Sequence, residues 1–203
     1  MTTTPSTALE TSPCSFCGSD SSRTVLKLPN ALQGAGADQW SLVRCASCGL
    51  VRLNPRPTPE AIAQLYAEEF TGSFLPDGSG LLSMLRYQKM YRTRRIGKAG
   101  DRILDVGCGD GLFLVTCKDR GLDASGCDID RTKLDYIRDT HGITVHFGEF
   151  PALDLEPQSF DHLTMFHTLE HIYDPFAYLR HAATVLKPGG DLVVEVPLFG
   201  GFD

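Results

Sequence analysis

The chain has 203 residues, of which 42% are hydrophobic and 22% charged, as expected for one globular domain with a small appendage. Its formal net charge is -6, and the acidic excess lies after residue 56, which disfavours a large nucleic-acid surface there because phosphate binding requires accumulated positive charge. A run of about 18 apolar residues and a signal sequence are both missing, so we expect no membrane span and a cytoplasmic location.

Two cysteine pairs dominate the first quarter of the chain. Each has the pattern C-x-x-C-Gly, in which two thiolates can reach one tetrahedral ion and the glycine permits a tight turn. The four residues are Cys14, Cys17, Cys45 and Cys48. Because four thiolates close the coordination shell, we predict a structural Zn(2+) site in a zinc ribbon over residues 13–57, with a redox pair or reduced thiols as alternatives.

The segments on either side of the ribbon are less distinctive. Residues 1–12 are polar without apolar periodicity, which predicts a disordered leader. After a proline-rich exit, Thr58 as N-cap and Pro59 at the first helical position predict the start of a helical lead-in over residues 58–99.

From residue 100 to 203, short apolar runs alternate with helical patterns. The predicted strands cover residues 102–106, 123–129, 143–147, 161–166 and 191–196. The predicted helices cover 112–121, 131–142 and 174–190, with Asp174 as an N-cap and Gly189 beyond the last helical turn. The alternation predicts an α/β fold with a parallel sheet covered on both faces, in which ligands bind at the carboxyl ends of the strands.

The clearest motif is ILDVGCGDG, residues 103–111, a buried strand followed by Gly107, Gly109 and Gly111 at the start of a helix. Glycines at such a turn let backbone N–H groups approach a ligand. Asp128 ends the next strand, where a carboxylate can accept hydrogen bonds from ribose hydroxyls. The dinucleotide fingerprint requires a small residue where this chain has Leu112, which weakens the alternative of an NAD-dependent oxidoreductase.

These residues resemble the class I S-adenosylmethionine-dependent methyltransferases over roughly residues 100–197. The matching segments, in order, are LDVGCGDG, CDID, FGEF, FDHLTMFHTLEH and LKPGG. The resemblance implies a Rossmann-like methyltransferase domain in which the three glycines surround the methionine part of the cofactor. It also implies that Asp105 supports the glycine loop and that Asp128 binds the ribose.

The resemblance assigns four further positions around the cofactor. Glu149 and Phe150 match residues near adenine, and Phe166 and His167 match a loop at the methionine end. An exposed loop acid at Glu149 and a core residue at Phe150 are the structural alternatives. The remaining cysteines, Cys108, Cys117 and Cys127, are predicted to be small buried side chains and not nucleophiles.

His167-x-x-Glu170-His171 has the spacing of an inverted zinc-protease motif, which needs a continuous helix. A strand is predicted directly before His167 and a new helix after Asp174, so we expect a loop or a single turn here. In related enzymes a histidine in this loop acts as a base, which makes His171 the first and His167 the second catalytic candidate, with a packing or capping role as the alternative. Ubiquinone-pathway O-methyltransferases and a small-RNA methyltransferase group bind a divalent ion through E-x-x-E-H, where this chain has His167 in place of the first Glu.

The run LVRCASCGLVRLNPRPTPEAIAQLYAEEF resembles the zinc-ribbon lead-in of bacterial methyltransferases that include sugar C-methyltransferases. In that family the lead-in helices help to build the substrate side, which makes Tyr66, Phe70 and Tyr87 candidate pocket residues, with core packing as the alternative. A similar architecture in an rRNA methyltransferase group contacts RNA through its ribbon, but the ribbon here has no dense Lys/Arg run.

We therefore expect a methyltransferase for a small molecule such as a sugar nucleotide or another metabolite. The alternatives are an RNA methyltransferase, an NAD-dependent oxidoreductase and a metal-stabilised binding module without catalysis. Class I domains add a sixth and a seventh strand after the fifth, whereas this chain ends at LFGGFD. Truncation, completion by a homodimer or a partner chain, and loss of activity are the three interpretations of that ending.

Overall fold

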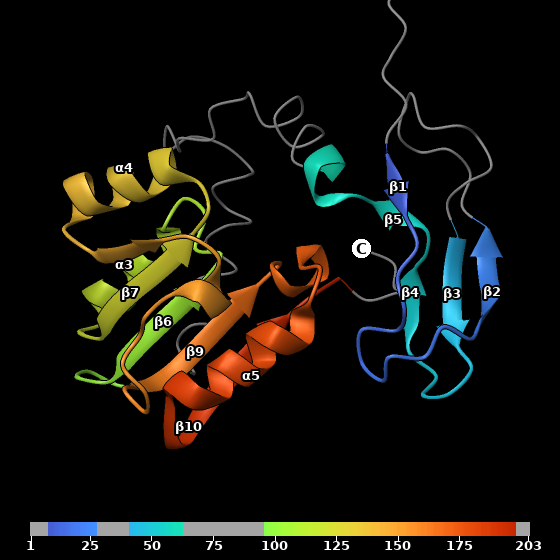
Figure 1. The fold of residues 1–203 in the computed structure, drawn as a ribbon. Coiled ribbons are helices and arrows are strands. Elements are labelled where there is room, and N and C mark those ends of the chain that lie inside the picture. Colours follow the sequence, from blue (N-terminus) through green and yellow to red (C-terminus); the bar gives the residue numbers. More distant parts are fainter. Residues whose placement is uncertain (1–7, 28–40, 63–95, 198–203) are drawn as a thin grey trace, which may run out of the picture. The chain divides into compact units, whose positions relative to one another are not determined.

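The computed structural model describes residues 8–27, 41–62 and 96–197 (Figure 1). The chain divides into two compact units, Met1–Ser73 and Phe74–Asp203. No helix in the described ranges is long and apolar enough to cross a membrane.

The first unit contains an antiparallel sheet of three strands, β2 (Ser22–Lys27), β3 (Ser41–Cys45) and β4 (Val51–Leu53), with β3 in the middle. One cysteine knuckle precedes β2, and the other connects β3 to β4. Gly18 N–H and Gly49 N–H donate to the carbonyls of Cys14 and Cys45, which closes the two knuckle turns. Both glycines have positive φ, as the C-x-x-C-Gly pattern requires.

The prediction of a disordered leader up to residue 12 is wrong at its end. Strand β1 (Leu9–Glu10) pairs antiparallel with β5 (Arg56–Pro57). Glu10 also accepts a 2.7 Å hydrogen bond from Arg56 Nε, and Ser12 N–H donates to the side chain of Asn54. These partners lie more than 40 positions away in sequence, so a search for local apolar periodicity could not find them.

A helical turn begins at Pro59, and Thr58 caps it as predicted. Thr58 Oγ1 accepts from the N–H of Ala61 at 3.3 Å, and its carbonyl accepts from the N–H of Ile62. The rest of the predicted lead-in, including Tyr66, Phe70 and Tyr87, lies outside the described residues.

The second unit contains a five-stranded sheet with the order β10-β9-β6-β7-β8, and every neighbouring pair is parallel (Figure 1). Its strands are β6 (Arg102–Val106), β7 (Asp123–Asp128), β8 (Thr144–Phe147), β9 (Phe160–Phe166) and β10 (Leu186–Glu195). This is the parallel sheet predicted from the alternation of strands and helices.

Three helices connect these strands: α3 (Leu112–Asp119), α4 (Arg131–His141) and α5 (Pro175–Val185). Successive side chains of β6 point to opposite faces of the sheet. Leu104 lies in a cluster with Ala182 and Val185 of α5, whereas Ile103 lies in a second cluster with Cys117 of α3. The helices therefore cover both faces, as the strand pattern predicted.

The last helix is shorter than predicted and the last strand is longer. Helix α5 ends at Val185, because Leu186 already pairs with Phe160 of β9. The register then shifts between Leu186 and Asp191, so that the segment predicted as the end of the helix forms an irregular start of β10. Pro188 lacks the N–H that a helix would need at this point.

Candidate functional site

The glycine loop after β6 turns sharply against the end of β7. The N–H groups of Gly107 and Cys108 both donate to the carbonyl of Cys127, at 2.8 and 3.1 Å. Gly107 has φ +72, and a Cβ there would lie 2.4 Å from Thr168 Oγ1. A side chain at this position would therefore clash with the loop that follows β9, which explains the glycine.

Gly109 lies at the tip of this loop and has φ +55. A Cβ built at Gly109 meets no atom within 4 Å, so packing does not require glycine here. The backbone conformation does, because an ordinary residue is strained at positive φ. The loop thus presents a bare stretch of backbone on an open side, as a backbone contact to a ligand needs.

Asp128 joins the glycine loop to the carboxyl end of β7. Its Oδ2 accepts a 2.9 Å hydrogen bond from Gly109 N–H, and its Oδ1 accepts one of the same length from Asp130 N–H. A carboxylate offers about four lone pairs, so two acceptor positions remain for a ligand. The side chain predicted to bind ribose hydroxyls therefore also fixes the loop predicted to surround methionine.

Asp105 is buried, with 3% of its surface exposed, on β6 just before the glycine loop. It accepts a 2.6 Å hydrogen bond from the hydroxyl of Thr164, a fully buried residue on neighbouring β9. A buried carboxylate needs such donors. The bond ties Asp105 to β9, and its expected role in supporting the glycine loop stays a prediction.

The predicted adenine segment follows β8. Phe150 is only 1% exposed, and its ring packs against Tyr178 and His181 of α5, so its side chain belongs to the core. Glu149 is exposed, and one of its oxygens accepts a hydrogen bond from the Tyr178 hydroxyl. Burial raises the pKa of Tyr178 above its usual range, and Glu149 adds to that shift. Tyr178 therefore remains a hydrogen-bond donor that holds the Glu149 carboxylate in place.

An apolar side chain next to Asp128 was missed from the sequence. Ile129 is 65% exposed directly after the β7 strand, which is unusual for an isoleucine. Phe147 at the end of β8 is also exposed, and the guanidinium of Arg131 lies 3.9 Å above its ring. The signal in the sequence is an apolar residue between the two acids of CDID, and the strand predicted to include it ends one residue earlier, at Asp128.

The loop after β9 contains one short 3-10 turn, η2 (Leu169–His171), as predicted from the strand before it and the helix start after it. This segment does not form the continuous helix through His167 and His171 that an inverted zinc-protease motif requires. Thr168 connects this loop to the glycine loop, because its hydroxyl donates to the carbonyl of Val106 at 3.1 Å.

His167 sits between two carboxylates at the end of the sheet. Its Nε2 lies 3.1 Å from Glu195 Oε1 at the end of β10, and its Nδ1 lies 3.7 Å from Glu170 Oε1. Its φ of +51 is a left-handed conformation that few non-glycine residues adopt. Glu195, which the sequence did not single out, thus links the ends of β9 and β10 through His167.

His171 ends the short turn and is half exposed, with 53% of its side chain accessible. Its Nε2 lies 3.9 Å from the same oxygen of Glu170 that faces His167, which is beyond hydrogen-bond distance. The two catalytic candidates therefore face the same carboxylate oxygen of Glu170, at 3.7 Å and 3.9 Å.

Phe166, the last of the predicted cofactor residues, ends β9 on the side of α3. Its ring packs edge-on against Phe113, with the centroids 5.0 Å apart.

The three cysteines of this unit are buried, and burial raises the pKa of Cys117 and of Cys127 to about 12 and that of Cys108 further. They are thus structural side chains, as predicted.

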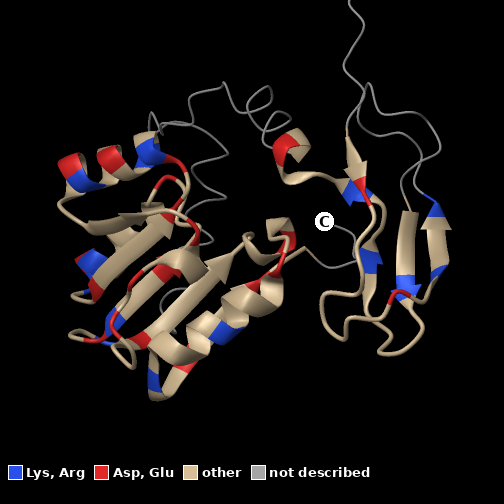
Figure 2. Cartoon of the chain, in the orientation of Figure 1, with Lys and Arg blue, Asp and Glu red and all other residues tan. Residues whose placement is uncertain are grey.

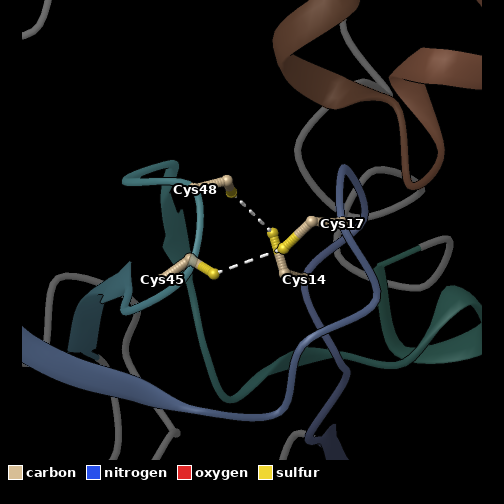
Figure 3. Close-up of side chains that lie close together, drawn as sticks. All are labelled: Cys14, Cys17, Cys45 and Cys48. Carbon is tan, nitrogen blue, oxygen red and sulfur yellow. Dashed lines mark hydrogen bonds between the residues drawn. The ribbon is translucent and has the colours of Figure 1, made fainter.

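The four ribbon cysteines converge in the first unit (Figure 3). Their sulfur atoms all lie within 4.8 Å of one another, and two cross-pairs, Cys14–Cys48 and Cys17–Cys45, are 3.5 Å apart. Sulfurs bound at about 2.3 Å to a tetrahedral ion stand about 3.8 Å apart, so the arrangement fits one zinc ion. Among the described residues it is the one group of three or more ligands with this geometry.

Mutual contact and burial push the pKa values of these thiols apart. The N–H of Cys48 donates to Cys45 and lowers the pKa of that thiol to about 6. The N–H of Leu50 also lowers the pKa of Cys48, but burial and the neighbouring sulfurs outweigh it and raise that pKa to about 12. A bound divalent cation would remove this conflict by stabilising all four thiolates.

Comparisons with known proteins all point to methyltransferases. A family model described as a methyltransferase domain matches residues 83–200. The ubiquinone biosynthesis O-methyltransferase of Ralstonia nicotianae is 39% identical over 99 residues, which cover 45% of this chain and 41% of that protein. The protein of the same name from Xanthomonas euvesicatoria is 36% identical over 111 residues, 52% of this chain and 46% of that protein. The chain thus spans less than half the length of these curated relatives.

Two solved structures resemble this chain in fold. A SAM-dependent methyltransferase from Archaeoglobus fulgidus aligns with a TM-score of 0.52 and 25% identity, covering 66% of this chain and 58% of that one. A protein from Pyrococcus horikoshii aligns with a TM-score of 0.53 and 20% identity, covering 64% of each chain.

Proposed function

The chain belongs to the methyltransferase domain family, and from that membership we propose that it transfers the methyl group of S-adenosylmethionine to a small molecule. The observation that carries this proposal is the hydrogen bond from Gly109 N–H to Asp128 Oδ2. It joins the two elements that would contact the methionine and ribose parts of one cofactor, at the carboxyl ends of adjacent parallel strands.

The residues around this bond would each contact a different part of the cofactor. Gly107, Gly109 and Gly111 present backbone to its amino-acid part, with Asp105 behind them. Asp128 accepts from the ribose hydroxyls, and Glu149, held by Tyr178, accepts from a donor on the base. The exposed side chain of Ile129 offers the base an apolar surface.

Methyl transfer makes small demands on the protein. The bound cofactor supplies a methyl group on a positively charged sulfur that leaves as a neutral thioether, so the leaving group needs no acid. The loop after β9 has to align the acceptor with that methyl group and, for an acceptor that must lose a proton, to supply a base.

We assign the base role to His171 and a bracing role to His167. Both ring nitrogens of His167 face carboxylates, which suits a side chain that holds β9 and β10 together. His171 is half exposed and lies next to Glu170, whose negative charge would stabilise the imidazolium formed when His171 accepts a proton. The relatives' name, O-methyltransferase, supports an acceptor hydroxyl as the group that would lose this proton.

The ribbon would hold one structural zinc ion through Cys14, Cys17, Cys45 and Cys48. A closed shell of four thiolates leaves no open position for a substrate or a water molecule. The proposed contribution of zinc is therefore the fold of the first unit and not the chemistry.

Calorimetric titration with S-adenosylmethionine, and with NAD as a control, tests the cofactor assignment. We expect saturable binding of the first and none of the second. Incubation of the protein and cofactor with metabolite extracts, followed by mass spectrometry, should then reveal a small molecule heavier by one methyl group. Binding of NAD instead would contradict the proposal, and cofactor binding without any methylated product would favour a non-catalytic binding module.

A further inference from the structure

Arg52 on β4 has a buried guanidinium group without a hydrogen-bond acceptor among the described residues. Its three nitrogens, Nε, Nη1 and Nη2, are all buried, and none has a hydrogen-bond partner among the groups that the structure describes. A buried guanidinium with five N–H donors and no acceptor is rare, because it loses its hydration without compensation. Such a group calls for an anionic partner.

The position of Arg52 follows from the register of the ribbon sheet. It stands directly opposite Val43 of β3, and directly opposite residues in an antiparallel pair point to the same face. Val43 is only 6% exposed, so this is the covered face of the sheet. On its other side Val43 stands opposite Thr24 of β2, which is exposed, so the covered face opens towards β2.

The charges on the neighbouring strands do not supply the missing partner. Strands β2, β3, β4 and β5 each contain Arg or Lys and no Asp or Glu (Figure 2). Among the described strands of this unit, the acidic residue is Glu10 on β1, and its carboxylate is bound to Arg56. Arg23 and Arg44 are exposed to solvent, so among the cations of β2, β3 and β4 it is Arg52 whose charged group is buried.

We propose that Arg52 is the receptor for an oxyanion of a small-molecule ligand, either a phosphate or a carboxylate group. The planar fork of a guanidinium donates two parallel hydrogen bonds to either group, which a lysine ammonium cannot match. The other cations of the ribbon strands add a favourable field for an anion. The methyl acceptor is one ligand that would carry such a group, but the site is defined without reference to methyl transfer.

The test is calorimetric titration of the 203-residue chain, prepared with zinc, against pyrophosphate, inorganic phosphate and acetate, in a buffer free of other oxyanions. The matched variants are Arg52→Met, which removes the charge, and Arg52→Lys, which keeps the charge and loses the fork. Arg44→Met is the control, because Arg44 is exposed and neighbours Val43 on the same strand. Each protein is also melted with and without the anion.

We expect saturable binding of at least one anion to the wild-type chain and to Arg44→Met. Affinity should fall at least tenfold in Arg52→Met and less in Arg52→Lys. The anion should raise the melting temperature of the wild type and not that of Arg52→Met, since a ligand stabilises only a protein that binds it. Whether pyrophosphate and phosphate or acetate give the shift decides between the two oxyanions.

Two results would overturn the proposal: no binding of any of the three anions to the wild type, or equal binding to the wild type and Arg52→Met. If Arg52→Met does not fold, the same comparison between the wild type and Arg52→Lys decides, with unchanged affinity as the contradicting result. S-Adenosylmethionine is absent from these measurements, so their outcome does not depend on the proposed methyl transfer.

Discussion

Asp128 Oδ2 accepts a 2.9 Å hydrogen bond from the backbone N–H of Gly109, which ties the end of β7 to the glycine loop after β6. The same carboxylate accepts from Asp130 N–H at the start of α4. One side chain therefore fixes the two backbone segments between which a nucleoside joined to an amino acid would lie. Its replacement should affect both the fold and the binding of the cofactor.

Asp128→Asn should lower the affinity for S-adenosylmethionine at least tenfold and the free energy of unfolding by about 1.5–3 kcal/mol, the usual worth of a hydrogen bond to a charged group. The carboxylate accepts from two N–H groups, one at each oxygen. In the variant the amide NH2 replaces one oxygen, so that a donor would face a donor. Titration calorimetry and thermal melting measure the two effects. Asp123→Asn, at the exposed opposite end of β7, is the control and should change neither by much.

Gly109→Ala should weaken cofactor binding more than its cost in stability explains. Its φ of +55 predicts a loss of about 1–2 kcal/mol of stability, while the added methyl group would stand on the open side of the loop. Gly142→Ala is a matched control, because Gly142 has φ +59 and ordinary space at the end of α4. The two variants should lose similar stability, and only Gly109→Ala should lose cofactor affinity. Equal affinities would show that the loop does not contact the cofactor.

His171→Gln should reduce methyl transfer about 100-fold or more, the typical contribution of a general base, without changing cofactor affinity. His167→Asn is the comparison, because asparagine tolerates the left-handed φ and its amide can still donate to Glu195. That variant should retain most of the turnover. If His167→Asn loses as much activity as His171→Gln, the roles assigned to the two histidines are wrong.

Removal of zinc with a strong chelator should unfold the first unit and leave the second unit able to bind S-adenosylmethionine. Cys45→Ser should have the same effect, since three thiolates and a hydroxyl bind zinc much less tightly. Elemental analysis should find one zinc ion per wild-type chain. Cys117→Ser, which alters a buried thiol of the other unit, should keep that zinc.

The pair Asp161 and Lys187 should contribute to acid stability. Lys187 Nζ donates to both oxygens of Asp161 at 2.8 and 2.7 Å, which lowers the pKa of that carboxyl, and the N–H of Arg102 adds to the effect. A lowered pKa in the folded state gives stability that is complete above the unfolded pKa of about 3.9 and disappears as pH falls through the folded value.

Lys187→Met should therefore be less stable than the wild type near neutral pH, by less than about 1 kcal/mol because both side chains are partly exposed. The difference should shrink as pH falls below about 4. Urea unfolding at pH 7 and at pH 3 measures it. Lys98→Met, at an exposed lysine near the start of β6, should show no such pH-dependent difference. A difference that grows on acidification would have the wrong sign.

Much of the fold followed from local patterns in the sequence. The strand over 102–106 and the helices that begin at Leu112, Arg131 and Pro175 are found where apolar periodicity, caps and glycines indicated. Two predictions failed where a distant partner decides the structure. Leu9 and Glu10 are held by β5, and Leu186 is taken from the helix into the sheet by Phe160.

The sequence by itself indicated the two cysteine pairs that come together, the parallel α/β architecture and the glycine loop with its following acid, because spacing and backbone requirements are local properties. Only the tertiary structure decided which carboxylate each side chain meets. Glu195 reaches His167 from 28 positions away, Tyr178 holds Glu149 from another element, and the fold buries Arg52 without an acid. These relationships arise when strands and helices distant in sequence pack together, and their energies depend on burial and distance, which no spacing rule contains.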